Sequence, residues 1–94
     1  MYEIIQSATF SKWLSGLARM RIHVRLDRVR LGNFGDAVPI GEGLFELRIH
    51  YGPGYSLYYV QRDMRFVILL CGGDKTSQPR DIEKAKIIAK EWRD

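Results

Sequence analysis

The stretch from residue 66 to residue 92 constrains the fold more than any other part of this chain. It begins with a nearly all-apolar run, which is typical of a strand covered on both faces. Gly72-Gly73 then predicts a tight turn, and Pro79 suits the first turn of a helix that Ser77 or Gln78 would cap. A helical stripe of apolar residues completes the pattern, at Ile82, Ala85, Ala89 and Trp92.

The remaining apolar patterns predict an α+β domain. Residues 2–6 favour a short strand, and residues 8–17 a helix whose apolar stripe is Phe10, Trp13, Leu14 and Leu17. Three strands then follow a loop at residues 33–43, with a hairpin turn at residues 51–54. The expected order is β-α-α-β-β-β-α, with helices on one antiparallel sheet. Since the chain has 94 residues, we expect 1–94 to form a single domain.

Residues 18–31 fit two interpretations. Met20, Ile22, Val24 and Leu26 alternate with polar residues, as in a strand. The same segment also has two apolar helical faces separated by arginines, and fourteen residues is an ordinary helix length. We favour a helix packed on two sides and ended by Gly32.

Charge and cysteine content narrow the function classes. The net charge is +4, with five arginines between residues 19 and 30, which favours nucleic acid or an acidic protein as a partner, although a solvated helix face has the same pattern. The single cysteine, Cys71, cannot form an internal disulfide and favours a cytoplasmic protein. No signal peptide or membrane-spanning run is visible, so we expect no membrane association.

Polar residues follow the ends of neighbouring predicted strands. Arg48 and His50 share one strand face, Tyr55 follows the hairpin, and Lys75 and Gln78 follow the last strand. If these strands pair as a meander, the side chains converge. Cations stabilise charge on phosphoryl oxygens, and histidine moves protons near neutral pH. The cluster therefore favours RNA cleavage by attack of the ribose 2′-OH on its neighbouring phosphate, although each residue alone is more often an ordinary surface residue.

Metal ligands do not occur at recognisable spacings. His23 and His50 are far apart, and neither H-x-x-x-H nor C-x-x-C is present. The segment from Gly72 to Thr76 lacks the leading glycine of a P-loop. We therefore expect no metal and no cofactor.

Several short motifs together resemble the HigB-like branch of the RelE/ParE toxin superfamily, also called addiction-module killer proteins. The resemblance covers nearly the whole chain and includes the arginine-rich second helix. The motifs are Glu46-Leu47-Arg48-Ile49, Gly52-Pro53-Gly54-Tyr55, Tyr58-Tyr59, Leu70-Cys71-Gly72-Gly73-Asp74-Lys75 with Gln78, and Leu31-Gly32-Asn33-Phe34-Gly35-Asp36.

The resemblance implies a small twisted antiparallel sheet with two N-terminal helices and a C-terminal helix. It further implies a type II toxin that cuts mRNA on the ribosome without metal and is silenced by a cognate antitoxin in a larger hetero-oligomer. By position, Arg48 and Lys75 match basic residues of the RNA-cutting relatives, and His50 is a candidate base by its chemistry. RNA contacts are expected from Arg21, Arg25, Arg28 and Gln78.

Two residues depart from the family pattern. Ser56 stands where relatives commonly have arginine, and Glu46 where the best-known RNA cutters have a basic residue. A single charge-stabilising donor contributes roughly 3 kcal/mol to catalysis, so these losses matter. Two alternatives therefore stay open, a toxin that poisons gyrase and a member that only binds its antitoxin.

Overall fold

The computed structural model of this chain describes residues 1–15 and 19–92. The expected end of the first helix, at Gly16 and Leu17, lies outside these residues. None of the helices in the described ranges is long and apolar enough to cross a membrane. In chain order the elements are β1 (Glu3–Gln6), α1 (Ala8–Ser15), α2 (Arg19–Arg30), β2 (Ala37–Gly41), β3 (Leu44–Ile49), β4 (Tyr55–Arg62), β5 (Phe66–Asp74), the 3-10 turn η1 (Lys75–Ser77) and α3 (Gln78–Glu91).

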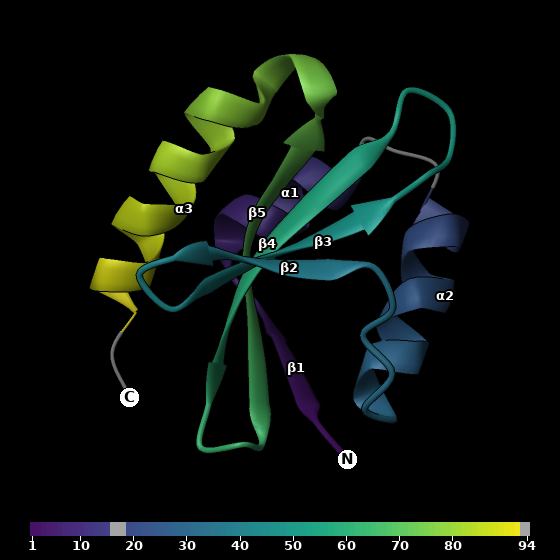
Figure 1. The fold of residues 1–94 in the computed structure, drawn as a ribbon, viewed down its shortest axis with the longest axis vertical. Coiled ribbons are helices and arrows are strands. Elements are labelled where there is room, and N and C mark those ends of the chain that lie inside the picture. The colour runs from purple at the N-terminus through teal and green to yellow at the C-terminus, as the bar shows by residue number, and fades with distance from the viewer. Residues whose placement is uncertain (16–18, 93–94) are drawn as a thin grey trace.

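The strands form one five-stranded sheet in the order β1-β5-β4-β3-β2 (Figure 1). Strands β2 to β5 are an antiparallel meander, and β1 lies parallel to β5 with Ile4 opposite Val67. The α+β class and the expected order of elements are confirmed, with β2 as one additional strand before the three predicted strands. The sheet is mixed rather than fully antiparallel as expected, because β1 pairs with β5 in parallel.

Strand β2 lies in the segment that the sequence predicts as a loop. Its glycines and Pro39 are turn formers, but proline is tolerated on an edge strand, where its missing N–H is not needed. Glu42 and Gly43 join β2 to β3 with positive φ angles of 54° and 77°, which is the conformation of a two-residue type I′ turn. This short edge hairpin therefore has the local sequence pattern of a loop.

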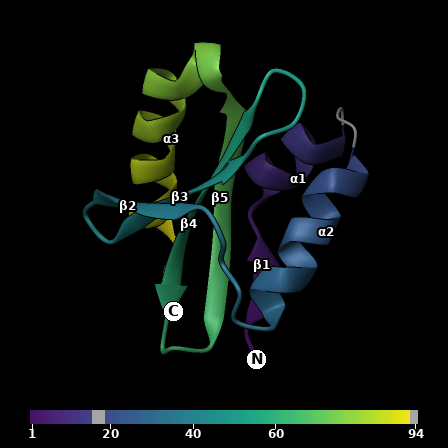
Figure 2. The same ribbon diagram turned by 45° about the vertical axis from the view of Figure 1, so that its right-hand side comes forward.

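Helices cover both faces of the sheet. In Figure 2, α1 and α2 lie on one face and α3 on the other. Consecutive residues of β4 and β5 are buried. Because adjacent residues of a strand point to opposite faces of the sheet, both strands are covered on both sides. The core under α1 and α2 contains Phe10, Leu14, Ile22, Leu26, Val29, Leu47, Ile49, Leu57, Tyr59, Val67 and Leu69. The core under α3 contains Leu44, Tyr58, Val60, Ile68, Leu70, Cys71 and Ala85.

Helix α2 packs on one side only. Its face with Ile22, Leu26 and Val29 is buried, while Met20 and Leu31 are 79% and 70% exposed. The helix assignment is confirmed, but the expected packing on two sides is wrong. Gly32 ends the helix as predicted, with a φ of 91° and its N–H bonded to the Val29 carbonyl at 2.9 Å.

Gly72 and Gly73 do not form the predicted tight turn: they continue β5, paired with Leu57 and Ser56 of β4, and their lack of a side chain is needed for close packing. A Cβ on Gly72 would overlap the Trp13 ring, and one on Gly73 would overlap the Asp81 carboxylate. Asp74 then accepts hydrogen bonds from the backbone N–H groups of Thr76 and Ser77, which starts η1. Ser77 stands at the N-cap position of α3 as predicted, but its side chain makes no capping hydrogen bond.

Candidate functional site

A polar pocket of about 300 Å³ opens where β3, β4 and η1 meet the start of α3. It brings together side chains from positions 46 to 78 of the chain, as a meander predicts. The catalytic candidates Arg48, His50 and Lys75 all line it, and so does Gln78. The full lining is Glu46, Arg48, Ile49, His50, Gly54, Tyr55, Ser56, Lys75 and Gln78.

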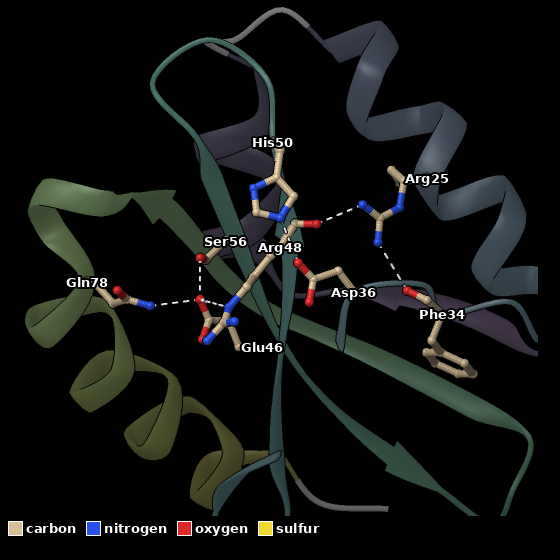
Figure 3. Close-up of polar contacts among 8 residues, drawn as sticks. All are labelled: Arg25, Phe34, Asp36, Glu46, Arg48, His50, Ser56 and Gln78. Atoms are coloured by element: carbon tan, nitrogen blue, oxygen red, sulfur yellow. Dashed lines mark hydrogen bonds and ion pairs between the residues drawn. The ribbon is translucent and has the colours of Figure 1, made fainter. Parts of the chain in front are cut away.

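Glu46 is a buried carboxylate in this pocket, with 4% of its surface exposed. Its Oε2 accepts a hydrogen bond from the Ser56 hydroxyl at 2.6 Å and another from the Gln78 amide at 2.7 Å. The Nε of Arg48 lies 3.4 Å from the same oxygen (Figure 3). The donors compensate the cost of burying the charge and hold the carboxylate in one place.

This arrangement orients Arg48. Its backbone N–H donates to the Asp36 carbonyl at 2.9 Å, and its Nε faces Glu46. Among the described residues, no hydrogen bond engages its two terminal amino groups. Those are the donors of the planar fork that binds a phosphate or carboxylate in bidentate fashion. Glu46 neutralises part of the pocket's positive charge, and it also fixes the Arg48 guanidinium in place.

His50 is held by a residue that the sequence does not single out. Its Nε2 lies 2.6 Å from Oδ2 of Asp36, in the loop before β2 (Figure 3). The hydrogen bond with His50 is the main cause that lowers the pKa of Asp36 below its usual range. The Asp36 side chain is therefore a carboxylate at neutral pH.

Lys75 reaches the pocket across the β3–β4 hairpin. The fold brings its side chain to Gly54, where a Cβ would come within 3.1 Å of the Lys75 Cε. Glycine at this position leaves room for the aliphatic stem of the lysine. Lys75 and Arg48 therefore line one pocket from two distant parts of the chain.

The three arginines expected to bind RNA lie outside the pocket lining. Arg25 is committed to the fold, because its guanidinium donates to the carbonyls of Arg48 at 2.7 Å and Phe34 at 3.1 Å. Burial is the main cause that lowers the pKa of Arg25, followed by the nearby charge of Arg28. Arg21 lies 4.4 Å from the centre of the Tyr51 ring. Arg28 is exposed on α2. Arg25 thus supports the strand that carries Arg48, and its contact with RNA stays a prediction.

Two other buried groups lie near the site. The Tyr58 side chain is buried, and burial is the main cause that raises its pKa, against the opposing effect of the neighbouring Gln78 and Ser56 side chains. Burial likewise raises the pKa of the Cys71 thiol to about 12. Its sulfur donates to the Asp81 carbonyl at 3.3 Å. Cys71 is therefore a protonated core residue, as its apolar neighbours predict.

Sequence reasoning missed Glu46 as a buried partner, Asp36 as the partner of His50, and the structural role of Arg25. The alternation of Glu46, Arg48 and His50 places all three on one strand face. That pattern does not show that the start of α3 covers Glu46, nor that residue 36 folds back on residue 50. In the part of the chain that the structure describes, no group of three or more His, Cys, Asp or Glu residues could hold a metal ion.

These features define a small α+β protein with a cationic pocket at one end of a mixed sheet. The chain is 45% identical to an uncharacterized protein of Haemophilus influenzae over 93 residues, which is 95% of this chain and 94% of that protein. It therefore belongs to the same family as that protein. No family model matches the sequence.

The fold is also that of a solved protein. The crystal structure of YafQ from E. coli strain BL21(DE3) superimposes with a TM-score of 0.62, over 83% of this chain and 98% of YafQ. The sequence identity is 15%. At that identity the likeness shows a shared RelE-like fold, which is the fold class expected from the sequence.

Proposed function

We propose that this chain is a single-domain toxin of a type II toxin–antitoxin module, and that it cuts mRNA on the ribosome. The observation that supports this most is the convergence of Arg48, His50 and Lys75 in one pocket of a YafQ-like fold. The HigB-like motifs in the sequence point to the same class. We place the active protein in the cytoplasm, where ribosomes and mRNA are found.

The proposed chemistry uses the ribose 2′-OH as nucleophile. His50 takes the 2′ proton, the 2′ oxygen bonds to the adjacent phosphorus, and the bond from phosphorus to the 5′ oxygen breaks. The leaving oxygen takes a proton from water. Arg48 and Lys75 stabilise the charge on the phosphoryl oxygens, which is the largest contribution that such a pocket can make. The products are a 2′,3′-cyclic phosphate and a 5′-hydroxyl.

Gln78, Arg21 and Arg28 have supporting roles in this proposal. Gln78 lines the pocket while it holds Glu46, so it lies beside the bound nucleotide. Arg21 and Arg28 give α2 an exposed positive surface for RNA. The exposed apolar side chains of Met20 on the same helix and Leu31 just after it give a cognate antitoxin a surface to cover in a hetero-oligomer.

Expression in bacteria tests the proposal. The wild-type protein should stop growth and generate new 5′ ends within transcripts. Arg48→Ala should restore growth, because it removes the oriented guanidinium. Arg65→Ala is a matched control, since Arg65 pairs with Glu3 at 3.3 Å and is absent from the pocket lining. Equal killing by wild type and Arg48→Ala would contradict the nuclease role.

The buried Glu46 beside Arg48 favours two alternatives, because it removes net charge from the pocket. In the first the chain acts on gyrase, and in the second it only binds its antitoxin. DNA breaks with intact transcripts after induction would indicate the gyrase target. Normal growth and intact RNA with wild-type protein would indicate a member that only binds.

A further inference from the structure

The site contains a second acidic residue, which touches its histidine from outside the pocket. Asp36 is absent from the pocket lining, yet its carboxylate lies 2.6 Å from the Nε2 of His50. We propose that Asp36 is a positioning residue, which fixes the His50 ring so that Nδ1 is the nitrogen that takes the 2′ proton of RNA. This inference rests on the proposed nuclease function.

The fold places Asp36 for this contact through its backbone. The Asp36 carbonyl accepts a hydrogen bond at 2.9 Å from the backbone N–H of Arg48, which lies two residues before His50. The Arg25 guanidinium donates to the carbonyl of Phe34, two residues before Asp36, at 3.1 Å and to the Arg48 carbonyl at 2.7 Å. Residues 34–36 are thus bound to the end of β3 at both backbone and side chain (Figure 3).

The contact selects one tautomer of the histidine. An ionised carboxylate only accepts hydrogen bonds, so the proton between the two residues belongs to Nε2. In the neutral ring the lone pair then lies on Nδ1, which Figure 3 shows on the side of the ring away from Asp36. After Nδ1 takes a proton, Asp36 stabilises the imidazolium that forms.

The exposure of the His50 and Asp36 side chains indicates that their contact orients the ring more than it stabilises the fold. The His50 and Asp36 side chains are 70% and 40% exposed. Pairs this exposed contribute little to folding stability, so the main consequence of the contact is the direction of the His50 ring. The other charged groups around the pair of His50 and Asp36 are Arg48 and Glu46 on β3, Lys75 on η1, and Arg25 on α2, with the phenol of Tyr55 on β4.

The test compares Asp36→Asn with Asp27→Asn. Asp27 is a matched control, because it also makes an exposed ion pair at 2.6 Å, with Arg30 on α2. Asp36→Asn should slow cleavage roughly 10- to 100-fold at neutral pH. Asp36→Glu, which keeps the carboxylate, should recover part of the rate.

The 15N NMR signals of the two histidine rings separate this inference from the proposed function. In Asp36→Asn the His50 ring should lose its preference for a proton on Nε2, while the ring signals of His23, on α2, stay as in wild type. Unchanged His50 ring signals and an unchanged cleavage rate, in a protein whose wild type cleaves RNA, would overturn this inference alone. If the wild-type protein leaves RNA intact, the proposed function fails, and the base role of His50 fails with it.

Discussion

Arg25 offers the sharpest test of how α2 supports the pocket. Its guanidinium joins the helix to the end of β3 and to the loop before β2, through the carbonyls of Arg48 and Phe34. Arg28 is one turn further along the same helix and exposed. Replacing each of the two arginines with alanine should therefore have very different consequences for stability.

The size of the effect follows from the two contacts. A hydrogen bond from a charged group contributes about 1.5 kcal/mol or more when buried, and about 1 kcal/mol here because the side chain is partly exposed. Losing both costs about 2 kcal/mol of unfolding free energy. For a chain of 94 residues this lowers Tm by about 8–16 °C. Arg25→Lys, which can keep one of the two hydrogen bonds, should lose about half as much unfolding free energy.

Thermal unfolding by circular dichroism measures the difference. Arg28→Ala should unfold within about 2 °C of wild type, because its charge lies beside the like charge of Arg25 and exposed positions tolerate substitution. Equal Tm values for Arg25→Ala and wild type would show that the guanidinium does not hold β3. Equal losses for the two alanine variants would mean that the effect comes from net charge rather than from these contacts.

Three further predictions concern the end of β5. Gly72→Ala should cost about 1–3 kcal/mol in urea unfolding, because the new Cβ overlaps the Trp13 ring, and Trp13→Leu should relieve most of that cost. The Cys71 thiol, with its pKa raised to about 12, should resist a thiol reagent at pH 8 until urea unfolds the chain; rapid labelling of the native protein would contradict its burial. Hydrogen bonds from Thr76 lower the pKa of Asp74, so the ionised side chain stabilises the fold at pH values above the ordinary pKa of an aspartate. That stabilisation should fade between about pH 5 and pH 2, and Asp74→Ala should flatten the pH dependence of Tm in this window.

Most of the fold is predictable because its patterns are local. The alternation in β3, the all-apolar run of β5 and the stripe of α3 each follow from burial on one or two faces. Gly32 marks the end of α2 because a left-handed residue is needed there. Strand β2 was not predictable in the same way, since Pro39 and the flanking glycines resemble a loop unless an edge partner is known.

The site was only partly predictable for a related reason. The pairing of the meander was enough to bring Arg48, His50 and Lys75 to one pocket. The burial of Glu46 depends on how α3 covers the strand, and the contact between Asp36 and His50 depends on a loop folding over the sheet edge. Such contacts join residues whose spacing along the chain carries no periodic signal.

Incubation of purified protein with ribosomes that translate a defined mRNA tests the claim that Arg48, His50 and Lys75 form a pocket that cuts RNA. The new 3′ ends are analysed for a 2′,3′-cyclic phosphate. We predict cyclic phosphate ends with wild type, and cutting at least about 100-fold slower with Arg48→Ala. Intact mRNA with wild type, or equal cutting by both proteins, would contradict the claim.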